Sequence, residues 1–382
     1  MEELIEKIAN NYETPTYVFD INTIKNRVDF FRKKFPENVE LCYAIKANTF
    51  VVKDIEEYVD RFEVCSNGEY EICHTKKVDE NKILISGINK DEKLINKIIG
   101  ESQVRLFSIE SMSQFEALKN QKENVKIIIR ITSGNQFGIN EDEAKEIIRN
   151  RNDYPNVEIL GLQYFTGTQK NSMKIYKKEL EYMNDLISQI KNEYDFEIKE
   201  LEYGTGFPVH YFDDEFDEES FMNEFSEILS QLQFKGKIIL EIGRSLVASS
   251  GMYLTKVVDK KVNKDEGFAI VDGGINHLVY YGQFMAMKKP KMSIYPKRDE
   301  TNQEVWNICG SLCTINDILV KKLEVSNLKV GDILVFKNTG AYSVTEGISL
   351  FLSRDLPQVL ISDINSNIKV ARNIMPTYNL NM

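Results

Sequence analysis

Lys46 is the first residue of the chain whose type and position suggest chemistry. It directly follows an apolar run, in the stretch Tyr-Ala-Ile-Lys-Ala-Asn. A lysine held in a partly dry pocket can lose its proton and form an imine with an aldehyde. An ordinary lysine at the rim of a fold would give the same short pattern, so this stretch alone leaves both interpretations open.

Two further motifs combine groups that can hold an anion. In Glu202-Tyr-Gly-Thr-Gly-Phe-Pro208, Gly204 and Gly206 would let backbone N–H groups converge on a phosphate. In Glu241-Ile-Gly-Arg244, the arginine can pair with a phosphate and the glutamate can face a cationic ring nitrogen. A plain turn and a local Glu–Arg surface pair are the competing interpretations.

The last two motifs lie in the final quarter of the chain. Cys309-Gly-Ser-Leu-Cys313-Thr-Ile-Asn-Asp317 contains a thiol that could donate a proton or remain an inert buried group. Thr339-Gly-Ala-Tyr342-Ser-Val offers a phenol that could donate to a phosphate or pack in a core. Neither motif is decisive alone, and it is the order of all five that carries information.

Eight short apolar runs alternate with helical patterns over the first two-thirds of the chain, and they would position these motifs. This alternation over roughly 220 residues predicts a (β/α)₈ barrel, with functional groups at the carboxyl ends of its strands. A doubly wound sheet with extra strands would give a similar pattern. The eight runs are Leu41–Ile45, Phe62–Val64, Ile83–Ile85, Arg105–Phe107, Val125–Ile131, Ile159–Leu162, Ile198–Tyr203 and Ile238–Glu241.

Three local patterns between these runs predict helices or loops. Val52, Ile55 and Val59 recur at helical spacing. Asn140 followed by Glu143 resembles a capping box that opens a helix over Glu141–Arg149. The acidic run Asp213–Glu219 is typical of a solvated loop or a helix start.

After about residue 250 the pattern becomes β-branched and aromatic, with Gly, Asn and Asp between the runs. Long helical patterns are scarce there, which predicts an all-β second domain. The clearest strand candidates are Tyr253–Val258, Phe268–Val271, Val330–Phe336 and Gln358–Ile361.

Composition excludes several classes of function. The 382 residues carry 48 Lys+Arg and 59 Asp+Glu, a net charge of −11 that argues against nucleic acid as a partner. No apolar run is long enough for a membrane span, and the polar N-terminus does not resemble a secretory signal. Five cysteines and three histidines without a close cluster argue against a disulfide framework and a metal site. We therefore expect a reduced, cytoplasmic protein.

Together the motifs resemble the pyridoxal-phosphate-dependent decarboxylases of fold type III, the family of diaminopimelate, ornithine and arginine decarboxylases. The six elements Tyr-Ala-Ile-Lys-Ala-Asn, Gly-Thr-Gly-Phe-Pro, Glu-Ile-Gly-Arg, Val-Asp-Gly-Gly, Leu-Cys-Thr and Gly-Ala-Tyr occur in family order between Thr14 and Ile361. The family fold is an N-terminal, alanine-racemase-like (β/α)₈ TIM barrel followed by a C-terminal β domain that the extreme N-terminus joins. The resemblance thus implies a barrel over 25–248 and a β domain from 1–24 and 249–382.

The resemblance also implies roles for individual residues. Lys46 would carry pyridoxal 5′-phosphate as a Schiff base, and Glu241 would keep the ring nitrogen protonated so that the ring accepts electrons. Cys313 would reprotonate Cα after carbon dioxide leaves, reaching the site from the partner of a homodimer with shared active sites. The cofactor-binding set is Lys46, Glu63, Arg130, Phe165, Thr168, Gly204, Thr205, Gly206, Glu241, Gly243, Arg244 and Tyr342. The substrate-side set is Asp272, Tyr280 and Thr314.

Departures from the family pattern bear on the substrate. Phe165 stands where the family usually has a histidine, and Gln136 and Thr168 replace a frequent lysine and serine. Thr314 stands where a Glu or Asp grips the distal amine of a diamino acid. Around Tyr280 there is no arginine for a distal carboxylate. These losses argue against diaminopimelate, lysine and ornithine.

The motifs Phe-Thr-Gly-Thr-Gln, Leu-Cys-Thr-Ile-Asn-Asp and Gly-Gln-Phe resemble a divergent, biosynthetic branch of the family. That branch contains the butirosin-pathway decarboxylase of L-glutamyl-[acyl-carrier protein], so the resemblance implies an unusual, carrier-tethered amino acid. An acidic carrier protein would need a basic patch on this acidic chain. Candidates for this patch are Lys288, Lys289 and Lys291, and a run of solvated charges without a binding role fits these lysines equally well. A decarboxylase of a free diamino acid and a racemase of the same fold are the alternatives.

Overall fold

The computed structural model describes residues 2–212, 215–298 and 303–382. Contacts within the chain divide it into two compact units. One unit comprises Asn26–Pro208 and Asp217–Leu246, and the other Met1–Lys25, Val209–Phe216 and Val247–Met382. The sequence analysis expects the division near residues 25 and 248, without the separate segment 209–216.

The first unit is a closed barrel of eight parallel strands, in the sequential order β2 to β9. Because β2 pairs with β9, the sheet has no edge, and the alternative of an open doubly wound sheet is excluded. All eight predicted apolar runs overlap barrel strands. The strands are β2 (Val39–Ala44), β3 (Arg61–Val64), β4 (Ile83–Ile85), β5 (Leu106–Ile109), β6 (Val125–Arg130), β7 (Val157–Tyr164), β8 (Glu200–Gly204) and β9 (Lys237–Ile242).

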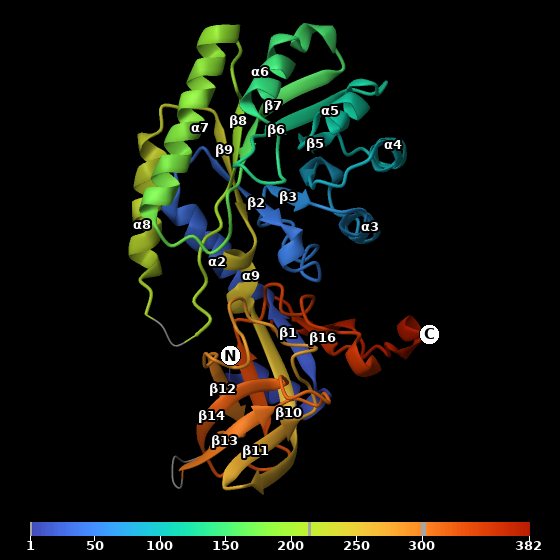
Figure 1. The fold of residues 1–382 in the computed structure, drawn as a ribbon, viewed down its shortest axis with the longest axis vertical. Coiled ribbons are helices and arrows are strands. Elements are labelled where there is room, and N and C mark those ends of the chain that lie inside the picture. The colour runs from blue at the N-terminus through green and yellow to red at the C-terminus, as the bar shows by residue number, and fades with distance from the viewer. Residues whose placement is uncertain (1, 213–214, 299–302) are drawn as a thin grey trace. The chain divides into compact units, whose positions relative to one another are not determined.

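Helices between the strands lie around the outside of the barrel (Figure 1). The predicted helix over Glu141–Arg149 is confirmed, and the Glu143 carboxylate accepts the backbone N–H of Asn140 at 3.0 Å. The helices of the chain are α1 (Glu2–Asn11), α2 (Ile21–Lys34), α3 (Asn67–Thr75), α4 (Glu92–Glu101), α5 (Met112–Lys119), α6 (Glu141–Arg149), α7 (Met173–Tyr194), α8 (Glu218–Gln231) and α9 (Arg244–Val247). Short 3₁₀ helices are η1 (Ile45–Ala47), η2 (Glu80–Lys82), η3 (Arg151–Asp153), η4 (Ala248–Ser250), η5 (Phe351–Ser353) and η6 (Tyr378–Asn381).

The prediction for the acidic run Asp213–Glu219 agrees with the structure where the structure describes it, whereas the prediction for residues 51–59 does not. Asp217 caps α8 by accepting the Ser220 backbone N–H at 3.0 Å, which confirms a helix start, whereas residues 213–214 lie outside the described residues. The helix expected from Val52, Ile55 and Val59 is wrong, because this segment consists of successive turns. The spacing still identified the buried side, since all three side chains are at most 1% exposed.

The second unit is built on a mixed sheet of nine strands, which confirms the predicted β domain. Its order is β14-β13-β11-β10-β1-β16-β17, with β15 pairing β10 and β12. The N-terminal β1 lies antiparallel to β10 and parallel to β16, so the extreme N-terminus joins this sheet as the resemblance implies. The strands are β1 (Thr16–Asp20), β10 (Gly251–Asn263), β11 (Glu266–Val271), β12 (Met292–Tyr295), β13 (Gln303–Cys309), β14 (Ile318–Ser326), β15 (Ile333–Lys337), β16 (Gln358–Ser362) and β17 (Ile368–Arg372).

Apolar side chains of α1 cover one face of this sheet. Ile5 and Ile8 of the helix share a buried cluster with Val18, Leu254 and Leu360 of three strands. Among the residues that the structure describes, no helix is long and apolar enough to cross a membrane.

Candidate active site at the carboxyl ends of the barrel strands

Lys46 projects from η1, immediately after barrel strand β2. Its Nζ donates to Oε2 of Glu63 at 2.8 Å and to Sγ of Cys65 at 3.4 Å. The lysine side chain is 43% exposed, whereas that of Glu63 is 3% exposed. The parallel register pairs Ala44 with Glu63, so neighbouring strand ends bring the amine and the carboxylate together.

The charges of this pair stabilise one another. Desolvation opposes the charge of Lys46, but Glu63, Cys65 and Glu241 outweigh it and raise the pKa of the lysine well above its usual value. Burial likewise opposes ionisation of Glu63, and Lys46 and then Arg130 reverse this, so the pKa of the glutamate is lowered. In the chain alone the pair is therefore an ammonium–carboxylate ion pair. Lys46 must lose its proton before it can act as a nucleophile, and Glu63, with its lowered pKa, stabilises the ammonium form rather than taking up this proton.

Glu241 lies at the end of β9, in the buried interior of the barrel. Its carboxyl accepts a hydrogen bond from the side-chain amide of Gln163 on β7. Burial, followed by the negative charges of Glu63 and Glu202, raises the pKa of Glu241 well above its usual value. A protonated ring nitrogen beside Glu241 would supply a positive charge that favours the ionised form of this buried carboxyl.

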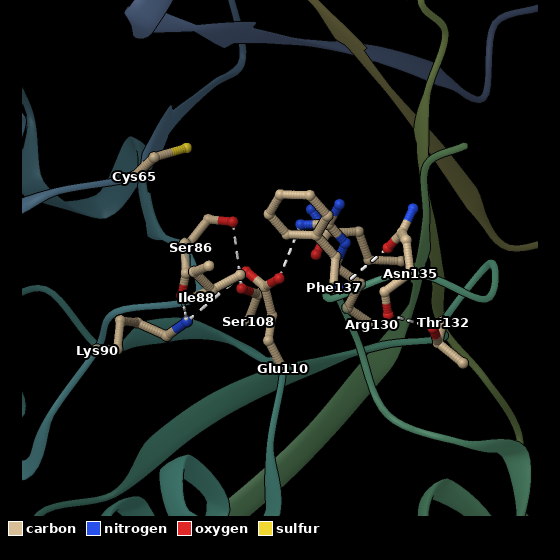
Figure 2. A network of polar contacts seen from close by, with 12 residues as sticks. Cys65, Ser86, Ile88, Lys90, Ser108, Glu110, Arg130, Thr132, Asn135 and Phe137 are labelled. Carbon is tan, nitrogen blue, oxygen red and sulfur yellow. Dashed lines mark hydrogen bonds and ion pairs between the residues drawn. The ribbon is translucent and has the colours of Figure 1, made fainter. Parts of the chain in front are cut away.

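Arg130 ends β6 and belongs to a buried charge network (Figure 2). Its Nη1 donates to Oε2 of Glu110 at 2.9 Å, and Nζ of Lys90 lies 4.0 Å from the other carboxylate oxygen. Burial lowers the pKa of Lys90 to about 8, against the opposing charge of Glu110. The guanidinium group of Arg130 also lies over the rings of Phe137, at 4.7 Å, and Phe165, at 6.0 Å.

Phe165 follows β7 and packs on the glycine segment that follows the next strand. A Cβ added at Gly204 would lie 2.4 Å from Cδ2 of Phe165, so the ring occupies the space that any other residue would fill. Gly206 has φ +56°, and a Cβ there would lie 2.1 Å from the carbonyl oxygen of Gly167. Thr205 between them donates its hydroxyl to the carbonyl oxygen of Glu241 at 3.0 Å.

The other barrel residues predicted to bind the cofactor follow the carboxyl ends of β7 and β9. Gly243 follows β9, and a Cβ there would meet Ala47 beside Lys46 at 3.3 Å. Arg244 is 9% exposed and begins α9. Thr168 lies in the segment between β7 and α7. The barrel thus gathers the predicted amine, carboxylates, aromatic ring and glycine segment at the carboxyl ends of its strands.

Sequence reasoning missed three polar residues of this region: Gln163, Glu110 and Lys90. Glu110 directly follows β5, and Gln163 is the penultimate residue of β7. Searching each barrel strand end for polar residues would have found both. Lys90 comes five residues after β4 in a loop, and no spacing signal marks it.

In the β unit, the segment around Cys313 is held by Asp317. The Asp317 carboxylate accepts the backbone N–H groups of Ile275 and Leu312, each at 2.8 Å, and the residue is 2% exposed. Cys313 itself is exposed. The Thr314 hydroxyl accepts the backbone N–H of Asn316 at 3.3 Å. The nearest carboxylate after the cysteine thus supports backbone rather than standing open to a ligand.

The remaining predicted residues of this unit have bonds within it. The Asp272 carboxylate accepts the hydroxyls of Thr14 and Thr255, each at 2.6 Å. Tyr280 is buried and donates to the carbonyl oxygen of Lys337 at 2.6 Å. Tyr342 has φ +65°. The roles of these residues, and of Cys313 and Thr314, toward a cofactor or substrate stay predictions.

The barrel residues fit the pyridoxal phosphate that the resemblance implies. The fit rests on an amine between acidic groups, a buried carboxyl that resists ionisation, and a glycine segment in which two added Cβ atoms would collide. Glycine-rich turns commonly bind phosphate through their backbone N–H groups. In this segment the Thr205 N–H donates to the carbonyl oxygen of Glu241 at 3.3 Å.

Comparison with known proteins supports this fit. Residues 21–248 match the family described as "Pyridoxal-dependent decarboxylase, pyridoxal binding domain". A diaminopimelate decarboxylase of Aquifex aeolicus is 27% identical, covering 96% of this chain and 91% of the relative. A 2-[(L-alanin-3-ylcarbamoyl)methyl]-2-hydroxybutanedioate decarboxylase of Staphylococcus aureus is 24% identical over 94% and 97%. An L-glutamyl-[BtrI acyl-carrier protein] decarboxylase of Niallia circulans is 26% identical over 92% and 90%.

Proposed function

We propose that this chain, which belongs to the pyridoxal-dependent decarboxylases, acts on an L-amino acid whose side chain is extended by an acyl linkage, such as glutamate on an acyl-carrier protein. Two relatives support this substrate class by their names. One acts on glutamate attached to a carrier protein, and the other on an alanine unit extended at C3 through an amide. In both substrates the far end carries no free ammonium group.

The observation that carries the proposal is that the Cys309–Asp317 segment presents no free carboxylate to a ligand, while the charged side chain bonded to it, Arg354, is a cation whose Nη2 donates to the Ser311 hydroxyl at 2.8 Å. Thr314 is uncharged, and the Asp317 carboxylate is bound to two backbone N–H groups. A free diamino acid needs an anionic partner for its distal ammonium group, because an unpaired charge loses its hydration without compensation. An acyl-extended side chain makes no such demand.

Pyridoxal phosphate, when bound, supplies a ring that accepts the electron pair left when the bond between Cα and the carboxylate breaks. We propose that Lys46 holds the cofactor covalently and that Glu63 positions the lysine as its ion-pair partner. Glu241, fixed by Gln163, would keep the ring nitrogen protonated. The Cys313 thiol would then give its proton to Cα after carbon dioxide leaves, and water would restore the thiol.

The remaining predicted residues would bind the cofactor without taking part in proton transfer. Phe165 would cover one face of the cofactor ring, and the guanidinium group of Arg130 lies over the Phe165 ring. The phosphate would be held by the group Thr168, Gly204, Thr205, Gly206, Gly243, Arg244 and Tyr342.

The test measures carbon dioxide release from a panel of substrates by the purified protein with pyridoxal phosphate. We expect release from L-glutamyl-[acyl-carrier protein] or from an L-amino acid acylated at its side chain. Diaminopimelate, lysine and ornithine should be turned over at least about a hundredfold more slowly, the range reached when a site lacks a needed polar partner. Equal or faster turnover of a free diamino acid would contradict the proposal.

A decarboxylase of a free diamino acid is the second candidate. It is supported by the diaminopimelate decarboxylase relative and by Glu346, a carboxylate that lines a cavity of about 290 Å³ in the β unit with Asn316 and Tyr280. If Glu346 grips a distal ammonium group, Glu346→Gln should raise KM for the diamino acid and leave KM for an acylated substrate unchanged. Exchange of the α-proton without carbon dioxide release would instead indicate a racemase.

We also propose that the protein is a homodimer whose partners share active sites. Cys313 is exposed in the single chain, and Ile315 beside it is 87% exposed, which is unusual for a large apolar side chain. Phe284 and Met287, at 68% and 76%, extend the apolar surface of the β unit.

Lys288 and Lys289 are exposed next to them and would suit an acidic carrier protein.

A further inference from the structure

A second buried charge cluster lies in the barrel unit, and the proposed reaction does not use it. Nζ of Lys170 donates to Oε2 of Glu179 at 2.7 Å and to the hydroxyl of Tyr203 at 3.0 Å. Both charged side chains are less than a tenth exposed. The Tyr203 hydroxyl and the Thr166 hydroxyl also donate to the Glu179 carboxylate, so every charged atom of the cluster has a partner.

Keeping a lysine here is costly. Burial lowers the pKa of Lys170 in spite of Glu179, so the pair recovers only part of the hydration that its charges lose. An apolar pair of similar volume would often be equally stable or more stable. Fold stability alone therefore does not explain this buried ion pair. The hydrogen bonds of Lys170 indicate a different role.

Lys170 connects the two segments that the proposed function assigns to the cofactor phosphate. Its backbone N–H donates to the carbonyl oxygen of Gly206 at 2.9 Å, and its Nζ lies 3.4 Å from the carbonyl oxygen of Gly204. It follows Thr168 by two residues, and its Cε would lie 3.2 Å from a Cβ at Gly206. One residue thus bonds both ends of the glycine segment while belonging to the segment that carries Thr168.

The cluster also anchors these loops to secondary structure. Glu179 lies on α7, and the Tyr176 hydroxyl of the same helix donates to the carbonyl oxygen of Lys170 at 2.9 Å. The ammonium group lies 4.8 Å from the ring centroids of both Tyr176 and Tyr203. The three N–H groups of the Lys170 ammonium already have partners in Glu179, Tyr203 and the Gly204 carbonyl oxygen, so its effect on a phosphate would come through the position of the backbone.

We propose that the Lys170–Glu179 pair is a positioning device that fixes the Gly204–Gly206 segment against the Thr168 segment, so that the phosphate of the cofactor meets a preformed site. Lys170 acts through the backbone and does not itself touch the phosphate. This inference rests on the proposed function, because it takes the glycine segment to be the phosphate site.

The test compares two ligands of the cofactor-free protein: pyridoxal 5′-phosphate and pyridoxal, which lacks the phosphate. Binding is followed by absorbance of the imine and by the Tm of the protein. In Lys170→Met/Glu179→Gln, which removes both charges together, we expect the preference for the phosphorylated ligand to fall by about tenfold or more, as for a displaced binding group. Affinity for pyridoxal should stay within about threefold of the wild type, because the ring contacts remain.

Tyr203→Phe and Lys177→Met complete the series. Tyr203→Phe removes one partner of Lys170 and leaves the Lys170–Glu179 ion pair in place, so neither buried charge is unpaired. It should reduce the preference by about threefold even if the double variant does not fold. Lys177→Met changes an exposed lysine of the same helix, and it should leave both affinities unchanged. An equal loss for both ligands would assign the cluster a purely structural role and overturn the inference, as would an unchanged preference. If the wild type binds neither ligand as an imine, the proposed function itself has failed.

Discussion

Lys90 is buried in the barrel, with 4.0 Å between its Nζ and the Glu110 carboxylate and a hydrogen bond of 2.5 Å to the carbonyl oxygen of Gly87. Burial lowers its pKa from 10.5 to about 8. Below pH 8 the lysine is charged in both the folded and the unfolded chain, so the folded state bears the whole cost of burying the charge. Between pH 8 and 10.5 the folded chain sheds the proton first, and stability rises with pH.

This predicts how Lys90→Met differs from the wild type. The free energy of unfolding of the wild type, relative to the variant, should rise by about 3 kcal/mol between pH 7.5 and 10.5. Urea unfolding at the two pH values measures this difference, and subtracting the variant removes the other groups that titrate. A difference between wild type and variant that stays constant with pH would show that Lys90 keeps its ordinary pKa.

At the scale of elements, the turn after β8 depends on the left-handed conformation of Gly206. With φ +56° and a Cβ position 2.1 Å from the carbonyl oxygen of Gly167, Gly206→Ala must displace backbone. We expect affinity for pyridoxal phosphate to fall by about tenfold or more. Gly100→Ala on α4 is a control in the same unit, because a Cβ there has open space and the residue lies outside the proposed phosphate site, so the affinity should change little. Equal affinities of the two variants would remove the turn from the phosphate site.

The β unit contains an element that should weaken in acid. His277 is buried, with Nε2 at 2.8 Å from the carbonyl oxygen of Asp355 and Nδ1 at 3.1 Å from the Tyr253 hydroxyl. Burial lowers its pKa from 6.5 to about 4. Between these values the unfolded chain binds a proton that the folded chain does not, so stability falls as pH falls.

For His277→Gln we therefore expect a weaker dependence on pH. The wild type should lose about 3 kcal/mol more stability than the variant between pH 7 and pH 4, and lose no more from this group below pH 4. Denaturant unfolding monitored through the single tryptophan, Trp306 of β13, reports on this unit. Parallel curves for the two proteins would mean that His277 has the same pKa in the folded and the unfolded chain.

For the whole molecule, sequence patterns predicted the barrel better than the β domain. Parallel strands buried on both sides appear as uninterrupted apolar runs, which explains why all eight barrel strands were found. In the β unit, β13 alternates exposed and buried positions, and β1, β12 and β17 are only four or five residues long. Such strands depend on partners far away in sequence, which a local pattern does not contain.

The candidate site was predictable where chemistry is local. Lys46 and Glu241 stand at strand ends in recognisable motifs, and the structure places each beside a partner. Glu63, the partner of Lys46, was also in the predicted set. Gln163, the partner of Glu241, and Glu110, the partner of Arg130, come from other strands and were missed, and the cluster around Lys170 joins three separate segments. Only the closed barrel brings these groups together, so spacing along the chain does not reveal them.

The proposed homodimer makes a prediction that only the assembled molecule can satisfy. If Cys313 serves the site whose lysine belongs to the partner, Lys46→Ala and Cys313→Ala should each be nearly inactive as separate proteins. Mixing equal amounts and allowing subunits to exchange should give heterodimers in which one of two sites is intact, and about a quarter of wild-type activity by random pairing. If both residues instead act within one chain, no heterodimer contains an intact site and the mixture should stay inactive. Sedimentation of each variant before and after mixing separates this outcome from a failure to exchange subunits.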